Sequence, residues 1–127
     1  MTVTQTRIQD YYPTHFHECF GCGARNRAGM CLSTFLQPDD SVVTHWQPSP
    51  RYAGASNTLH GGITAVLMDE VAGAAAFVEA HRRHGVALGA PLGVDFVTAN
   101  LSVNYLKPVL IDKEVAVTAL ISESAGR

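Results

Sequence analysis

The sequence predicts an α+β domain in which an antiparallel β-sheet wraps around one long buried helix. Three observations predict this class. Residues 61–81 are rich in Ala, Leu, Met and Val, as a long helix would be. Residues 30–47 have the pattern of a β-hairpin, and residues 94–122 alternate as strands do. A hairpin, a helix and then further strands are typical of an antiparallel sheet packed on a helix.

Composition sets the class of protein. The chain has 127 residues, 46% of them hydrophobic and 16% charged, which indicates one globular domain over residues 1–127. A formal net charge of −2 argues against a nucleic-acid partner or an anionic membrane surface.

We expect no signal peptide, because the N-terminus lacks an apolar core segment. We expect no transmembrane helix, because charges interrupt the longest apolar run. Three cysteines without secretory context favour reduced thiols and a cytoplasmic location.

The N-terminal half is expected to supply one hairpin between irregular segments. Pro, Asp and Ser cluster at residues 38–41, which predicts the turn between its two strands. We place those strands at residues 30–37 and 42–47. The flanking segments are a polar lead-in with a short helix at 1–12, a Gly-, Cys- and His-rich irregular segment at 13–31, and a loop at 48–58.

The helix predicted at residues 61–81 has a clear end signal. His81, Arg82, Arg83 and His84 fall at its C-terminus, where the helix dipole favours positive charge, and we expect them to be solvated. Gly85 is the expected C-cap.

Two strands are expected after the helix. Residues 94–105 alternate apolar and polar side chains from position 97 onward, and a Lys-Pro pair at 107–108 ends the run. Residues 113–122 alternate in the same way and form the second strand.

Two carboxylates lie inside the otherwise uncharged run 61–78, where an unpaired buried charge costs several kcal/mol. Helical spacing places Asp69 on a face of mostly small residues, which allows a ligand or a partner helix to approach closely. That face comprises Gly62, Ala65, Val66, Ala72, Gly73 and Ala76. Glu70 falls near a core stripe of Ile63, Val66, Leu67, Ala74 and Phe77, and we expect it to make a hydrogen bond or salt bridge. Asp69 is therefore the better candidate for a functional acid.

His60, Gly61 and Gly62 head the helix. Free N–H groups at a helix N-terminus stabilise negative charge, and glycines leave those groups accessible. Asp69 lies roughly 10 Å beyond Gly62 along the helix axis, at about 1.5 Å per residue. One helix therefore cannot present both groups to one reacting carbon. A symmetric dimer solves this by placing Asp69 of one subunit opposite Gly61 and Gly62 of the other.

These residues resemble a known family. The segment LHGGITAVLMDE (59–70), with NYLKP (104–108) later, resembles the hotdog-fold acyl-CoA thioesterases of the phenylacetate-pathway (PaaI-like) type. CFGCG (19–23) resembles an N-terminal signature of one branch. The likeness covers about residues 18–121. It implies a hotdog fold and homodimers, often paired into homotetramers, with acyl-CoA sites at the subunit interface.

The resemblance also implies roles for individual residues. Asp69 corresponds to the catalytic carboxylate, and Gly61, assisted by Gly62, corresponds to the oxyanion-binding amide. His60 is the motif histidine, and Thr98 falls where some members orient the water. We assign substrate binding to four further residues: Asn57, Glu70, Gly73 and Lys107. No cofactor and no metal is expected.

Two features depart from the family pattern. Some members have Asn or Gln six residues before the motif histidine, where this chain has Gly54, and Asn57 is out of register. Family members also continue with one or two strands beyond the last strand predicted here, so the sheet is expected to lack a C-terminal strand.

Three functions follow. The first is thioester hydrolysis, with Asp69 as general base or nucleophile. The second is a non-catalytic protein that binds acyl-CoA or an acyl carrier. The third is a metal protein, because Cys-x2-Cys beside histidines can ligate zinc. Its candidate ligands are His15, His17, Cys19, Cys22 and Cys31, and it lacks a clear second ligand pair; buried structural thiols are the simpler interpretation.

Overall fold

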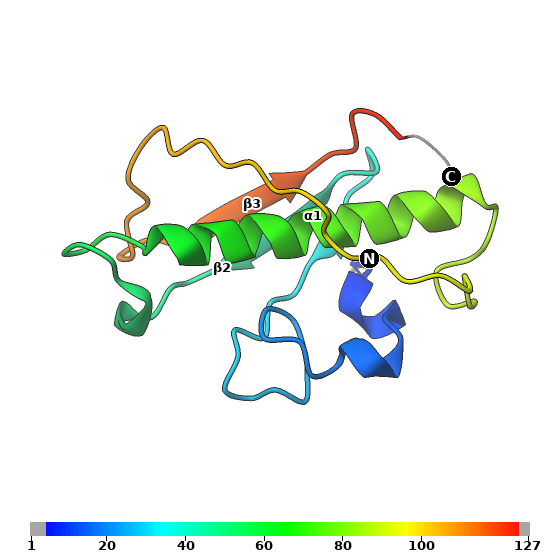
Figure 1. Ribbon diagram of the computed structural model, residues 1–127, viewed down its shortest axis with the longest axis horizontal. Helices are drawn as coiled ribbons and strands as arrows, with labels where there is room; N and C mark the ends of the chain where they lie inside the picture. Colours follow the sequence, from blue (N-terminus) through cyan, green and yellow to red (C-terminus); the bar gives the residue numbers. More distant parts are fainter. Residues whose placement is uncertain (1–4, 125–127) are drawn as a thin grey trace, which may run out of the picture.

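The computed structural model describes residues 5–124, and one long helix packs on a small antiparallel sheet, as the α+β prediction requires. In Figure 1, α1 runs along the long axis of the molecule with β2 and β3 behind it. In chain order, the elements are η1 (Ile8–Tyr11), η2 (Thr14–Phe16), β1 (Phe35–Leu36), β2 (Val42–Trp46), η3 (Pro50–Tyr52), α1 (Gly61–Arg83) and β3 (Val115–Ala119). The predicted N-terminal helix is the short 3-10 turn η1; residues 1–4 of that prediction lie outside the described part of the chain.

Helix α1 confirms the main prediction and extends it by two residues. Its buried side chains recur every three or four positions, so they form one face toward β2, β3 and η1. The apolar residues among them are Leu67, Val71, Ala74, Ala75 and Val78, and His81 near the end of the helix is also buried. The predicted core stripe is confirmed. Leu67 and Ala74 are buried, and Ile63, Val66 and Phe77 are half-buried and pack against the core.

The C-terminus of α1 is closed by a hydrogen-bonded cap. The Val86 N–H donates to the His81 carbonyl at 2.9 Å, and the Gly85 N–H donates to the Arg82 carbonyl at 3.2 Å. Gly85 has φ of +63°, which a residue without a Cβ adopts at little cost. Gly85 therefore ends the helix as predicted, one position beyond the cap residue His84.

The sheet confirms two of the four predicted strands. Its order is β1-β2-β3, with both pairs antiparallel and Val43 opposite Thr118. The strands predicted at 42–47 and 113–122 appear as β2 and β3. The strand predicted at 30–37 was mostly wrong and shrinks to β1, because the Met30 and Leu32 N–H groups donate instead to carbonyls of the preceding loop.

The turn between β1 and β2 lies where it was predicted. Asp39 Oδ1 accepts hydrogen bonds from the N–H of Ser41 at 3.1 Å and from its hydroxyl at 2.5 Å. Asp40 takes a left-handed conformation with φ of +66°. These side-chain bonds replace backbone partners that the turn cannot supply.

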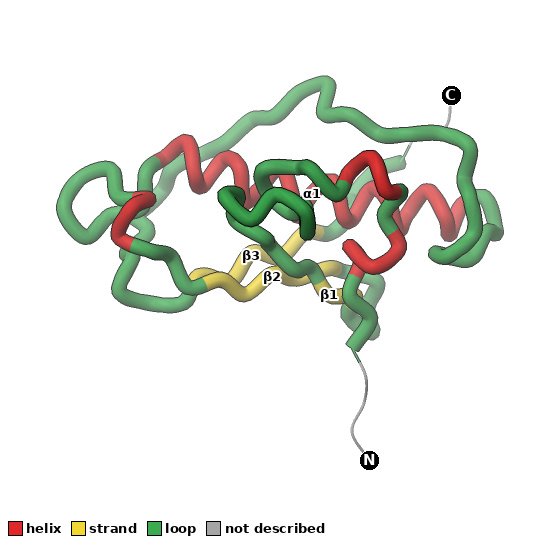
Figure 2. Tube along the Cα trace, turned by 90° about the horizontal axis from the view of Figure 1, so that it is seen from below, coloured by secondary structure: helices red, strands yellow, loops and turns green. Residues whose placement is uncertain are grey.

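The strand predicted at residues 94–105 was wrong. The segment has no ladder partner among the described residues, and it crosses α1 on the side opposite the sheet (Figures 1 and 2). Its alternating side chains indicated an extended backbone, but a strand also needs a neighbouring chain to receive its hydrogen bonds. Many of its apolar side chains and those just after it are exposed: Val94, Phe96, Val97, Leu101, Tyr105 and Leu106.

By length and composition alone, α1 qualifies as a candidate membrane span. The central helix of a water-exposed domain passes the same test, and here α1 buries Leu67 and Val71 against other elements of the chain.

Candidate functional site

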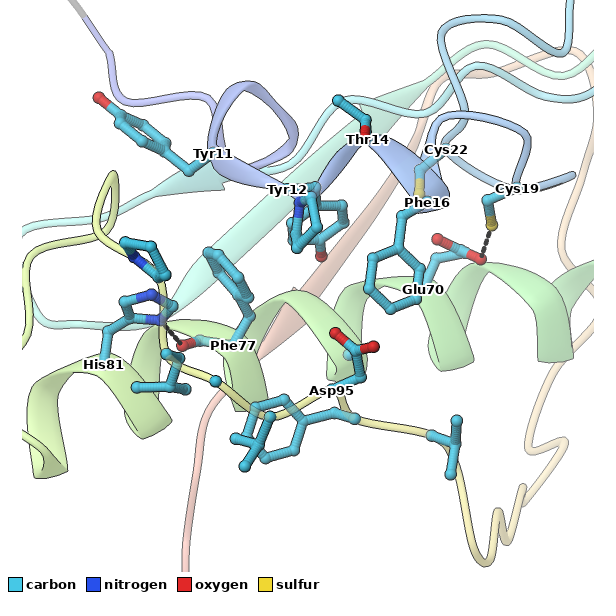
Figure 3. Close-up of a pocket in the computed structure, with 18 of the residues that line it drawn as sticks. Tyr11, Tyr12, Thr14, Phe16, Cys19, Cys22, Glu70, Phe77, His81 and Asp95 are labelled. Carbon is cyan, nitrogen blue, oxygen red and sulfur yellow. Dashed lines mark hydrogen bonds between the residues drawn. The ribbon is translucent and has the colours of Figure 1, made fainter.

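A cavity of about 760 Å³ lies between α1, the N-terminal segment and residues 89–98. Figure 3 shows aromatic rings and several polar groups around it. Its aromatic lining comes from Tyr11, Tyr12, Phe16, Phe77 and Phe96. A mostly apolar hollow with a few converging polar groups is the usual form of a small-molecule site.

Asp69 and Thr98 meet at the wall of this cavity. The Thr98 hydroxyl donates a hydrogen bond to Asp69 Oδ1 across 2.5 Å. Asp69 is half-buried on α1, and Thr98 belongs to the extended segment that crosses the helix. The structure thus brings together two residues that the sequence placed in one site. This bond fixes the orientation of the carboxylate and leaves its other oxygen without a protein partner among the described residues.

Gly73 and Glu70 line the same cavity. A Cβ added to Gly73 would meet nothing within 4 Å, so the helix surface there is open. Four of the predicted site residues therefore line this cavity: Asp69, Glu70 and Gly73 from α1, and Thr98 from the segment that crosses it.

Three further predicted residues, His60, Gly61 and Gly62, lie at the start of α1 and do not line the cavity. His60 Nδ1 accepts a hydrogen bond from the Gly62 N–H at 2.9 Å, so the histidine caps the helix. The Gly62 N–H is engaged in this bond, and its predicted assistance to an oxyanion stays a prediction. The Gly61 N–H has no protein acceptor among residues 5–124 and remains free to bind a ligand oxygen.

Tyr105 is a contact that sequence reasoning missed. Its hydroxyl donates to the Gly61 carbonyl at 2.8 Å, and its ring would lie 3.4 Å from a Cβ at that glycine. The ring therefore lies against the first turn of α1, at a distance where a Cβ at position 61 would make an ordinary van der Waals contact. In the sequence, Tyr105 was visible only as part of the apolar alternation of residues 97–105. That alternation does not indicate a contact with Gly61.

Asn57 and Lys107 stand apart from the other predicted residues. Asn57 has φ of +56° in the loop before α1, and its side-chain amide donates to Asp112 Oδ2 at 3.4 Å. Lys107 is exposed, and neither residue lines the cavity. Their predicted contacts with substrate stay predictions.

One chain therefore holds two separate half-sites. Asp69 lies eight residues after Gly61, which is roughly 12 Å along the helix axis at about 1.5 Å per residue. The carboxylate and the free amide cannot act on one carbonyl within one chain.

His81 corrects a sequence prediction. It was expected at a solvated helix end, but only 3% of it is exposed. Its ring nitrogens contact the Phe77 carbonyl at 2.9 Å and the Ala90 carbonyl at 3.3 Å, and it forms part of the cavity wall. The residues after α1 fold back over it, which a helix-end pattern does not reveal.

A second cluster borders the cavity on the N-terminal side. The Cys19 thiol donates to Glu70 Oε1 at 3.1 Å, and Cys22 lies beside both groups. Burial raises the pKa of the Cys22 thiol well above its usual range, and the hydrogen bond and charge of Glu70 raise it further. Among the described residues, these three form the group whose side chains could hold a metal ion.

The five-residue zinc set considered from the sequence is not assembled. His15 Nε2 instead lies 2.9 Å from Asp95 Oδ2. Cys31 is exposed and contacts only backbone carbonyls. Glu70 was missed as a partner of the cysteines, because no spacing rule links positions so far apart.

A family model described as the thioesterase superfamily matches residues 56–127, which is more than half of the chain. The match includes the start of α1, Asp69, Thr98 and β3. It does not include the cysteine segment. No curated protein and no solved structure matches the chain.

Proposed function

The chain belongs to the thioesterase superfamily, and from this we propose that it hydrolyses acyl-CoA thioesters to a free acid and CoA at sites shared by two copies of the chain. The observation that carries the proposal is the Asp69–Thr98 pair at the cavity wall. A carboxylate held by one hydroxyl, beside an apolar hollow, is suited to attack on an acyl group bound there.

Asp69 supplies the base or the nucleophile. As a base it takes a proton from water while the water oxygen bonds to the thioester carbon; as a nucleophile it forms an anhydride that water then cleaves. The Thr98 hydroxyl aims the carboxylate in either route. Collapse of the tetrahedral intermediate breaks the C–S bond and releases the CoA thiolate, which leaves readily without a strong acid.

The oxyanion is stabilised by the Gly61 N–H of the partner copy. This donor lies at the positive end of the helix dipole, where negative charge is favoured. One preorganised donor is commonly worth about 3–4 kcal/mol in the transition state. The roughly 12 Å between the half-sites makes a second copy necessary.

Exposed apolar surface supports such a partner. Val97 and Leu106 are each 89% exposed on the segment that crosses α1, and Ala72 and Gly73 leave the helix surface beside Asp69 open. Large apolar side chains that are exposed in this number support an interaction surface. A homodimer, or a tetramer built from dimers, would cover them.

The first experiment measures release of free thiol from a panel of acyl-CoAs by the wild type and by Asp69→Asn. The variant should lose turnover by orders of magnitude while it stays folded by circular dichroism. Unchanged turnover in the folded variant would refute the role of Asp69. The alternative function is that of a non-catalytic protein that binds acyl-CoA or an acyl carrier, and Gly54 in place of Asn or Gln supports it. Thermal stabilisation of the wild type by acyl-CoA without thiol release would favour this alternative.

The second experiment tests the shared site by mixing inactive variants. Gly61→Pro removes the amide proton at the first helical position, where proline is tolerated, and the preceding residue already has the extended conformation that proline requires. A mixed dimer of Asp69→Asn and Gly61→Pro has one intact site, so activity should return on unfolding and refolding the two together. Co-refolded Asp69→Asn and Asp69→Ala should stay inactive. No recovery in soluble mixed oligomers would contradict a shared site.

The PaaI-like subtype and a cytoplasmic location complete the proposal. The CFGCG segment supports the subtype, and the three cysteines are free thiols, as a reducing compartment would keep them. The acyl-CoA panel also tests the subtype, because it reports which acyl groups the aromatic cavity accepts.

A further inference from the structure

We propose that Cys19, Cys22 and Glu70 form a binding site for a zinc-type divalent cation that joins the N-terminal loop to α1. One sulfur from each cysteine and one carboxylate oxygen lie within 4.8 Å of one another. Two thiolates and a carboxylate are ligands that zinc accepts, and the Cys-x2-Cys spacing occurs in structural zinc sites. The site borders the same cavity as Asp69, and its Glu70 is one of the residues assigned above to substrate binding.

The ligand atoms are close to the spacing that a metal requires. Zinc bonds of about 2.0–2.3 Å in a tetrahedron place ligand atoms roughly 3.5–4 Å apart. Cys19 Sγ and Glu70 Oε1 are 3.1 Å apart, and no two ligand atoms of the group are more than 4.8 Å apart. Small side-chain rotations would therefore suffice, and the fourth position would be left for water or a ligand from the cavity.

The loop that carries the cysteines is closely fitted to Glu70. A Cβ on Gly21 would lie 2.3 Å from the Glu70 carboxyl carbon, so the backbone between the cysteines passes directly over that side chain. The Gly23 N–H donates to the Cys19 carbonyl at 2.8 Å, and a Cβ on Gly23 would meet backbone atoms of the same turn within 2.6 Å. The two thiols are thus presented by a tight, hydrogen-bonded turn, and not by a free loop.

Charge also favours a cation. Glu70 is half-buried, and within the described part of the chain no basic side chain pairs with it. A partly buried carboxylate without a counter-ion is costly unless a cation or hydrogen bonds compensate it. Divalent metal would displace the thiol protons, so binding releases two protons and replaces the Cys19–Glu70 hydrogen bond with metal bonds.

The test is a cobalt titration of the metal-free full-length protein under a non-thiol reductant. Co²⁺ should produce the near-ultraviolet thiolate charge-transfer band and the visible bands of a tetrahedral site, saturating at one ion per chain, and Zn²⁺ should abolish them by displacement. Protons released on Zn²⁺ addition, followed with an indicator dye, should match two thiols. Absence of a charge-transfer band in the wild type would overturn the proposal.

The variants assign the ligands. Cys19→Ser and Cys22→Ser should each remove or greatly weaken the band, and Glu70→Gln should weaken cobalt binding. The exposed Cys31→Ser is the matched control and should bind cobalt as the wild type does. If Cys22→Ser fails to fold, Cys19→Ser alone decides, since that thiol is only half-buried. An undiminished band in Cys19→Ser, or loss of the band in Cys31→Ser, would contradict the assigned site.

Discussion

The hydroxyl of Thr98 donates to Oδ1 of Asp69 at 2.5 Å and so joins the centre of α1 to the extended segment that crosses it. This bond is the only one that the Asp69 carboxylate makes within residues 5–124. It follows that the orientation of the proposed base depends on a residue 29 positions later in the chain.

Removing this hydroxyl should slow turnover more than it weakens substrate binding. Thr98→Val keeps the shape of the side chain but cannot hold the carboxylate, and a misplaced catalytic group costs roughly tenfold to 100-fold in rate. We expect kcat to fall by that amount with KM little changed, as measured by thiol release. Thr98→Ser, which keeps the hydroxyl, should retain most of the activity. Equal losses in both variants would show that the hydrogen bond is not what matters.

The His60 cap should contribute measurably to stability. Its Nδ1 accepts the Gly62 N–H, and losing such a cap typically costs about 1 kcal/mol of folding free energy. His60→Ala should therefore lower the free energy of unfolding in urea by about that amount. Asn is a good cap, so His60→Asn should recover most of it. If both variants are as stable as the wild type, the ring does not cap the helix.

Two glycines of the α1 region should respond oppositely to alanine. Gly85 has φ of +63°, so Gly85→Ala introduces strain and should destabilise the fold by about 1–2 kcal/mol. Gly73 is helical and exposed with open space around it, so Gly73→Ala should stabilise by up to about 1 kcal/mol. Thermal unfolding of both variants checks the pair. If Gly73→Ala instead destabilises, its surroundings are not open in solution.

The stability of the fold should decrease at alkaline pH because a thiol and a phenol are buried in the folded state. Burial and the neighbouring Glu70 raise the pKa of Cys22 above its ordinary 9.0, and burial raises that of Tyr12 above 10.0. Above these ordinary values the unfolded chain loses protons that the folded chain keeps. The unfolded state then binds fewer protons, so the free energy of unfolding decreases as pH rises.

The check is a series of melting temperatures between about pH 8 and pH 10.5, spanning the unperturbed thiol and phenol ranges, with a chelator present. Cys22→Ala should show a shallower decline than the wild type. Cys31→Ala, which changes an exposed thiol, should decline as the wild type does. Parallel curves for Cys22→Ala and the wild type would remove Cys22 as a cause.

Elements that depend on a single stretch of chain could be predicted from the local sequence pattern. Helix α1 and its Gly85 end were predictable because helical composition and the cap signal lie within 25 consecutive residues, 61–85. Strand β2 was predictable from the turn signal that precedes it, and strand β3 was predictable from alternation. Residues 94–105 have the same alternation but form no strand, because the missing requirement is a hydrogen-bonded neighbour, and alternation does not report one.

The candidate site divides in the same way. Asp69 could be singled out because a charge in an apolar helix is visible in the sequence itself. The contact of Cys19 with Glu70 spans 51 positions, and that of Tyr105 with Gly61 spans 44, so each depends on how separate segments dock. The buried position of His81 was hidden for the same reason: the chain after α1 covers it.

The uncovered apolar segment that crosses α1 has a thermodynamic consequence. If a second copy covers Val97 and Leu106, folding and association become linked equilibria. Dilution alone would then act as a denaturant, and the melting temperature would rise with protein concentration even though no bond within the chain had changed.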